Sequence, residues 1–155
     1  MKISLWCIGK TDEKYLVEGI DKYLTRLKHY TKIEYEVLKD VRPGQTPEET
    51  LKREADLIFS KLKADDVLVI MDERGQAYDS IGFAQYIQKF QNTSAKNVVF
   101  LIGGAFGHYD TIRQRAQHAI SLSRMTFSHQ MVRLFLVEQL YRAFTIIRGE
   151  KYHNE

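Results

Sequence analysis

The chain has 155 residues, of which 44% are hydrophobic and 28% are charged, and its formal net charge is +3. This is an ordinary globular composition for a single domain over residues 1–155, and so small a positive excess does not by itself indicate nucleic-acid binding. Because no apolar run is long enough to span a bilayer and the N-terminus lacks a signal peptide, we expect a cytoplasmic protein without membrane contact.

Strands and helices alternate along the chain. In order, hydrophobic spacing predicts a strand over 2–8, a helix over 13–28, a strand over 33–37, a helix over 46–62, a strand over 67–71, a helix over 80–92, a strand over 98–102, a short helix from about 110, a strand over 120–122 and a helix over 129–148. This alternation predicts an α/β fold with a mainly parallel sheet and helices on both faces.

Two helices begin with residues that suit a cap. Thr46 is expected to be the N-cap of one helix, with Pro47 at its first position and Glu49 closing a capping box. Ser80 is expected to cap the next helix.

The apolar run Val98–Ile102 ends in a turn that contains Gly103, Gly104 and Gly107. An unbroken apolar run of this length is typical of a strand buried on both faces. Glycines allow positive φ and the close approach of another molecule, and ligands of parallel sheets bind at such strand ends. A tight turn without a ligand is an equally open interpretation at this point, and the spacing does not match G-x-G-x-x-G.

The last third of the chain concentrates arginine and histidine. Its arginines outnumber its lysines, and a guanidinium suits phosphates and base edges. The histidines form no recognised metal-binding pattern, and no nucleophile motif is present. We therefore expect neither a metal site nor covalent catalysis.

The final predicted helix is apolar around most of its circumference. Such a helix must be buried on all sides. Sheet packing covers one side only, so we expect a second subunit on the other and favour a homodimer, although a central core helix is the alternative.

Five stretches together carry a resemblance to a known family: Leu101–Gly107, Ser121–His129, Val132–Arg133, Glu138–Ala143 and Tyr152–His153. In them the chain resembles the RlmH family of ribosomal RNA methyltransferases, and the likeness covers the whole chain. The resemblance implies a SPOUT-type fold with a C-terminal trefoil knot, a homodimer, and S-adenosylmethionine as methyl donor. The implied reaction methylates N3 of the pseudouridine at position 1915 of 23S rRNA, within assembled ribosomes.

The resemblance also implies roles for individual residues. The implied cofactor contacts are Met71 at a strand end, Gly103 and Gly104 in the glycine turn, and Leu122, Ser123, Arg124, Met125, Thr126 and Phe127 in the loop that follows. The residues implied near the substrate are His129, Arg133, Arg142, Tyr152 and His153. For the arginines, a solvated helix face or a salt bridge is the alternative, and for the Tyr-His pair a disordered tail. Family members usually carry arginine where this chain has Asn154.

Methylation of an imide nitrogen requires loss of its proton, so a base and a nearby cation assist the reaction. The sequence leaves open whether His129 or His153 is the base and whether Arg133 or Arg142 is the cation. We expect the tail, residues 149–155, to cross to the partner subunit and to become ordered with the substrate. Two other functions stay open: a SPOUT-like transfer RNA methyltransferase and a non-catalytic nucleotide-binding adaptor.

Overall fold

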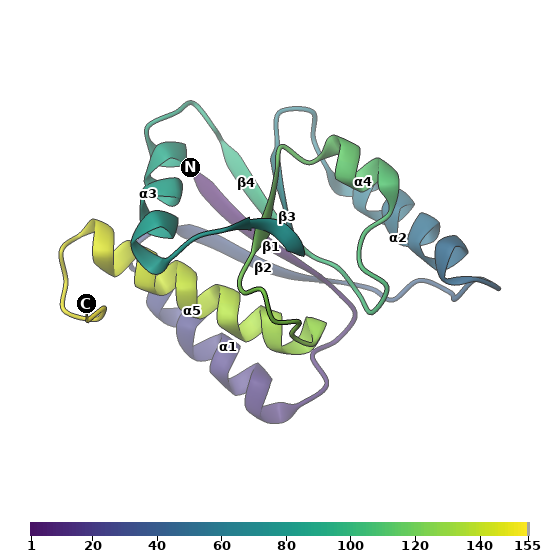
Figure 1. Ribbon diagram of the computed structural model, residues 1–155, viewed down its shortest axis with the longest axis horizontal. Coiled ribbons are helices and arrows are strands. Elements are labelled where there is room, and N and C mark those ends of the chain that lie inside the picture. The colour runs from purple at the N-terminus through teal and green to yellow at the C-terminus, as the bar shows by residue number, and fades with distance from the viewer. Residues whose placement is uncertain (155) are drawn as a thin grey trace.

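Five parallel strands form the sheet of the computed structural model, which describes residues 1–154 (Figure 1). The elements are β1 (Lys2–Ile8), α1 (Lys14–Leu27), β2 (Lys32–Leu38), α2 (Pro47–Lys61), β3 (Val67–Ala77), α3 (Ser80–Gln91), β4 (Asn97–Ile102), α4 (Asp110–Arg115), β5 (His118–Ser121) and α5 (His129–Ile147). The strand order is β2-β1-β4-β3-β5, and every neighbouring pair is parallel. The predicted α/β fold with a parallel sheet is confirmed.

Helices cover both faces of the sheet (Figure 1). Helices α1, α3 and α5 contribute to one apolar cluster, and α2 and α4 contribute to the other. The central strand β4 serves both, because Val98 and Phe100 point to the first cluster while Val99 and Leu101 point to the second. Its unbroken apolar sequence follows from this double burial.

The helix caps differ in detail from the expected ones. Thr46 does cap α2, since its hydroxyl accepts the Glu49 N–H at 3.2 Å, but the Glu49 carboxylate accepts the N–H of Gln45, one residue further out, at 2.7 Å. The prediction that Ser80 caps α3 is wrong. Asp79 is the N-cap and accepts the Gly82 N–H at 2.7 Å, because it holds the extended backbone conformation three residues before that N–H.

Strand β3 is longer than predicted. The run of apolar residues ends at Met71. After a break in register between Met71 and Gln76, however, the chain pairs again with β5, as far as Ala77. Strand β5 covers 118–121 rather than 120–122. The polar residues 72–75 thus leave the ladder and lie at the carboxyl edge of the sheet.

Helix α5 packs against both α1 and α3 (Figure 1). Its buried apolar residues are Leu136, Val137, Leu140, Ala143 and Phe144. One chain therefore covers most of its apolar surface, while Phe135 stays 36% exposed and contacts Phe127, with ring centroids 5.0 Å apart. None of the helices within residues 1–154 has the length and apolarity needed to cross a membrane.

Replacing Phe100 by alanine should lower the free energy of unfolding by about 3–5 kcal/mol, because the ring is fully buried between strands and helices. Urea denaturation followed by circular dichroism measures this loss. The matched control is Phe59→Ala on α2, where the ring is 39% exposed and the loss should be clearly smaller. Equal losses at the two positions would contradict the assignment of β4 as the core strand.

Candidate functional site

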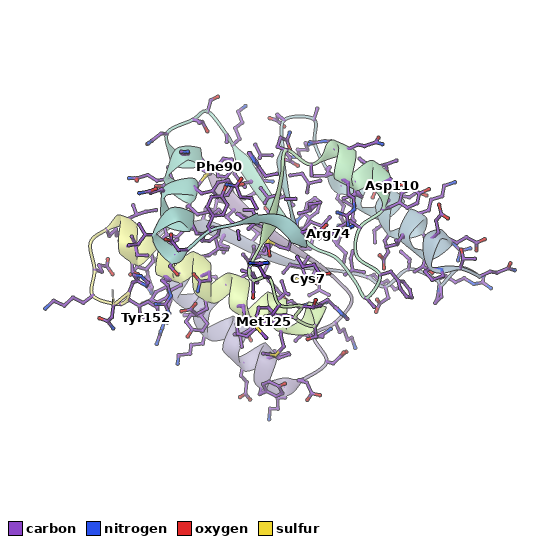
Figure 2. All side chains as sticks on the ribbon, viewed as in Figure 1. Cys7, Arg74, Phe90, Asp110, Met125 and Tyr152 are labelled. Carbon is purple, nitrogen blue, oxygen red and sulfur yellow. The ribbon has the colours of Figure 1, made fainter. Side chains whose placement is uncertain are left out.

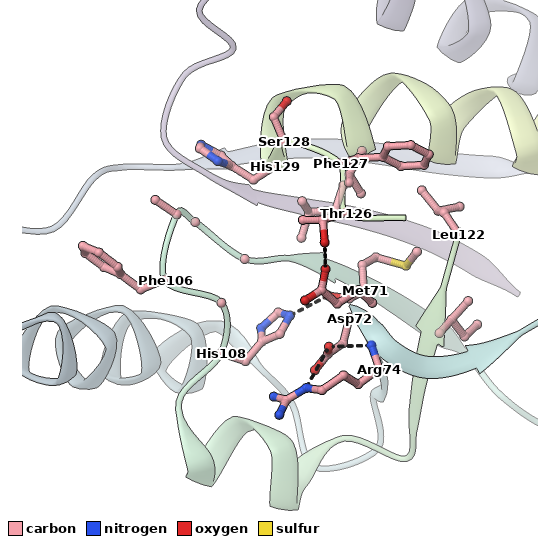
Figure 3. A pocket seen from close by; sticks show the side chains of 18 of the residues that line it. Met71, Asp72, Arg74, Phe106, His108, Leu122, Thr126, Phe127, Ser128 and His129 are labelled. Carbon is pink, nitrogen blue, oxygen red and sulfur yellow. Dashed lines mark hydrogen bonds and ion pairs between the residues drawn. The ribbon is translucent and has the colours of Figure 1, made fainter. Parts of the chain in front are cut away.

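A cavity of about 570 Å³ opens at the carboxyl ends of β3, β4 and β5 (Figure 3). It lies there because parallel strands bring their carboxyl ends, and the loops that follow, to one edge of the sheet. Apolar side chains, among them Met71, Ile102 and Ile120, line its inner part. The turn over 103–107 and the loop over 122–128 form its walls.

The glycine turn is closed by its own backbone. The Gly107 N–H donates to the Gly104 carbonyl at 3.2 Å, and Gly107 has a φ of +83°. A Cβ added at Gly103 would lie 2.7 Å from the Gly107 carbonyl oxygen. A side chain at 103 would therefore collide with the turn itself, whatever ligand the pocket holds.

His108 ties this turn to the end of β3. Its Nε2 lies 2.9 Å from the Met71 carbonyl oxygen, and the ring is buried (Figure 3). Burial lowers the pKa of His108, and a carbonyl can only accept, so the neutral ring donates its Nε2–H. Sequence reasoning assigned this histidine no role in the site.

The polar segment after Met71 supplies charge to the pocket. Asp72 pairs with the Arg113 guanidinium, and its Oδ1 accepts the Arg74 N–H at 3.0 Å. Burial opposes ionisation of Asp72, but these donors outweigh it and hold its pKa below the usual value. Thr126 donates to the Glu73 carboxylate, which joins this segment to the opposite loop (Figure 3).

Sequence reasoning missed these pocket residues because the predicted strand stops at Met71 and no role was assigned to the polar residues after it. The available signal was a carboxylate placed directly after a buried strand, at the edge where ligands of parallel sheets bind.

Most of the residues expected at the cofactor lie together in this pocket. Those that line it are Met71, Gly103, Gly104, Leu122, Ser123, Met125, Thr126 and Phe127. Arg124 is exposed and does not belong to the lining. The loop holds its shape through short hydrogen bonds, from the Ser121 hydroxyl to the Ser123 carbonyl at 2.6 Å and from the Met125 N–H to the Ser123 hydroxyl at 3.0 Å.

The residues expected near the substrate fall into separate places. His129, at the start of α5, lies on the pocket wall (Figure 3). Burial and the Arg133 charge lower its pKa, against the opposing effect of Asp12 and Asp40. Arg133 itself is fully buried behind the wall and bonds the carbonyls of Ile8 and Gly9, each at 2.7 Å.

Arg142, Tyr152 and His153 meet at the other end of α5. Arg142 bonds Glu138 at 2.5 Å and the Nδ1 of His153 at 3.1 Å, and its guanidinium lies 4.8 Å from the centre of the Tyr152 ring. The Tyr152 hydroxyl donates to Glu138 at 3.0 Å. Figure 2 shows Tyr152 and the pocket residue Met125 near opposite ends of the helix. The helical rise puts Arg142 about 20 Å along the axis from His129.

Within residues 1–154, no group of three or more His, Cys, Asp or Glu side chains is arranged to hold a metal ion.

Comparison with known proteins identifies the class of protein to which this chain belongs. The family model described as "Predicted SPOUT methyltransferase" matches residues 1–153. Among solved structures, a probable methylase family protein from Haemophilus influenzae shares the fold, with a TM-score of 0.52 and 11% identity over 99% of this chain and 70% of that one. The chain thus belongs to the SPOUT methyltransferases, and its fold agrees with that class.

Closer relatives give the particular family. A protein from Cytophaga hutchinsonii named ribosomal RNA large subunit methyltransferase H is 50% identical over 99% of this chain and 100% of its own length. A protein of the same name from Flavobacterium johnsoniae is 48% identical over the full length of both chains. The chain belongs to the family of ribosomal RNA large subunit methyltransferase H, as its sequence motifs predict.

The pocket fits S-adenosylmethionine, the methyl donor of this class of enzyme. Its apolar inner part suits an adenine ring, and its volume lies within the usual range for small-molecule sites. Backbone groups of the turn and the loop are available to bond the polar parts of the ligand.

Leu122→Trp should weaken S-adenosylmethionine binding at least tenfold, because the larger side chain occupies the cavity that Leu122 lines. Isothermal titration calorimetry with a chelator present measures the affinity, and the wild type should bind under the same conditions. Val37→Trp adds the same ring to an exposed position of the edge strand β2 and serves as control. Normal binding by Leu122→Trp, or loss of wild-type binding to the chelator, would contradict this site.

Proposed function

We propose that this protein methylates N3 of a pseudouridine in 23S rRNA, the one at position 1915, within the assembled ribosome. The observation that carries the proposal is the 50% identity, over the full length, to a protein named ribosomal RNA large subunit methyltransferase H. The pocket at the strand ends supplies the cofactor site that such an enzyme requires. An enzyme that acts on ribosomes is also consistent with the expected cytoplasmic location. The expected trefoil knot remains part of the proposal.

When bound, S-adenosylmethionine supplies an electrophilic methyl group on a sulfonium. The chain has two tasks: to align the nucleobase with that methyl group and to remove the N3 proton. His129 lies on the pocket wall with a lowered pKa, so its imidazole is uncharged near neutral pH and can accept a proton. We therefore choose His129 over His153 as the base.

The distance along α5 supports a site shared between two subunits. Arg142, Tyr152 and His153 lie about 20 Å from the pocket end of the same helix, too far to act on one nucleobase with His129. In a homodimer with antiparallel α5 helices, the tail of one subunit reaches the pocket of the other. Arg142 then stabilises the anion that develops on the nucleobase.

The tail would have to rearrange for this role. In a single chain it folds back onto its own helix, where Tyr152 packs on Tyr141 with ring centroids 4.7 Å apart and also contacts Arg142. Residues 149–154 are thus held by contacts of modest strength, not extended into solvent. Glu155 lies outside the described residues. We propose that the bound substrate replaces these contacts with new ones.

The substrate preference can be tested directly. Methyl incorporation should be fastest with assembled ribosomes and slow with large subunits, protein-free 23S rRNA or transfer RNA, because a net charge of +3 gives little phosphate attraction to capture a free RNA. Radiolabelled methyl transfer and mass spectrometry of the product measure the rates and the position. Equal rates on protein-free rRNA would overturn the ribosome requirement, and preference for transfer RNA would favour the alternative function.

A mixed dimer tests the shared site. One subunit carries Leu122→Trp and has a blocked pocket, while the other carries His153→Ala and has a defective tail. One of the two sites in this dimer combines an intact pocket with an intact tail, so activity should return although both parent homodimers are inactive. The control combines both substitutions in one subunit with a wild-type partner; there the intact pocket meets the defective tail, and activity should be lost. A mixed dimer as inactive as its parents would show that each subunit works alone.

A further inference from the structure

Arg133 is the largest fully buried side chain of the described part of the chain, and none of the ion pairs among residues 1–154 includes it. An unpaired buried charge is costly, so it persists only where hydrogen bonds compensate. Three such bonds are present: Nη1 donates to the Gly9 carbonyl at 2.7 Å and to the Thr11 hydroxyl at 3.0 Å, and Nη2 donates to the Ile8 carbonyl at 2.7 Å.

These acceptors all belong to the carboxyl end of β1 and the residues directly after it. Gln130, also on α5, makes two further hydrogen bonds to the same segment. Its Nε2 donates to the Lys10 carbonyl at 3.0 Å, and its Oε1 accepts the Asp12 N–H at 2.9 Å. The first turn of α5 is thereby fixed to residues 8–12. That turn carries His129 and Val132, which line the pocket.

His129 and Arg133 are four residues apart and lie on the same face of α5. Like charges at this spacing repel, so the buried guanidinium disfavours a charged imidazole. The other charged groups that act on His129 are Asp12, after β1, and Asp40, after β2, and both act in the opposite direction. Burial of the ring is the largest cause of the lowered pKa of His129, and the charge of Arg133 acts in the same direction.

We propose that Arg133 is a positioning residue that acts through His129: it clamps the first turn of α5 to the end of β1 and holds a buried positive charge one helical turn from the imidazole at the pocket. Arg133 does not touch the substrate. The role in proton removal rests on the proposed function, whereas the effect on His129 does not. A lysine would keep the charge, but a single ammonium group cannot reproduce the planar fork that reaches two carbonyls and a hydroxyl.

The test uses the full-length protein with Arg133→Gln and Arg133→Lys. The titration of His129 is followed by NMR, with its signal assigned from a His129→Gln variant, and kcat on ribosomes is measured against pH. The control is Arg148→Gln, which removes the same charge at the far end of α5, where the guanidinium lies over Tyr30.

In Arg133→Gln, the titration midpoint of His129 should rise, because the repelling charge is gone. The acid limb of the rate profile should move to higher pH by the same amount. Arg133→Lys should keep the wild-type midpoint but weaken S-adenosylmethionine binding several-fold, because the turn keeps only the Gln130 bonds and is clamped less firmly. Arg148→Gln should change neither quantity.

An unmoved midpoint in Arg133→Gln, or an equal shift in Arg148→Gln, would overturn the proposal. If Arg133→Gln does not fold, the test rests on Arg133→Lys. Wild-type affinity for S-adenosylmethionine in that variant would overturn the proposal that Arg133 clamps the first turn of α5. A shifted midpoint with an unmoved rate profile supports the action of Arg133 on His129 and shows that His129 is not the base.

Discussion

The double burial of β4 is the constraint on which the rest of the molecule depends. The strand bonds β1 and β3 on its edges, and its side chains alternate between two apolar clusters. Because both faces are covered by helices, polar groups and loops are confined to the strand ends. The carboxyl end of β4 is therefore where the chain can open a cavity, and the glycine turn, His108 and the segment after Met71 converge on it.

Helix α5 connects this cavity to a second polar cluster, formed by Glu138, Arg142 and the tail. Its first turn contributes His129 to the pocket, and its last turns hold Arg142 against Glu138 and the tail. A rigid helix keeps these two groups about 20 Å apart, so a single chain cannot use both on one nucleobase. The same rigidity is the reason for proposing that two subunits combine them in one site.

Sequence patterns predicted the α/β fold and most element positions, and the residues that the family resemblance implies at the cofactor line one pocket, with the exception of Arg124. The errors were local. Ser80 and Asp79 are both good capping residues, and sequence could not rank them. The strand β3 continues beyond Met71 because Gln76 and Ala77 find a partner in β5, a pairing that a hydrophobic pattern cannot reveal.

The sequence by itself determined that the strand over 98–102 is buried on both faces, because an unbroken apolar run must be covered on both, and it determined the family, because several spaced motifs agree over the whole chain. Only the tertiary structure decided what each charged residue does. Arg133 and Arg142 lie nine residues apart on one helix and look alike in sequence. One is buried on the carbonyls of β1, and the other pairs with Glu138 beside the tail. The physical reason is that the role of a guanidinium depends on the acceptors around it. For Arg133 the acceptors lie more than a hundred residues away in the sequence, whereas for Arg142 the acceptor Glu138 is only four residues away.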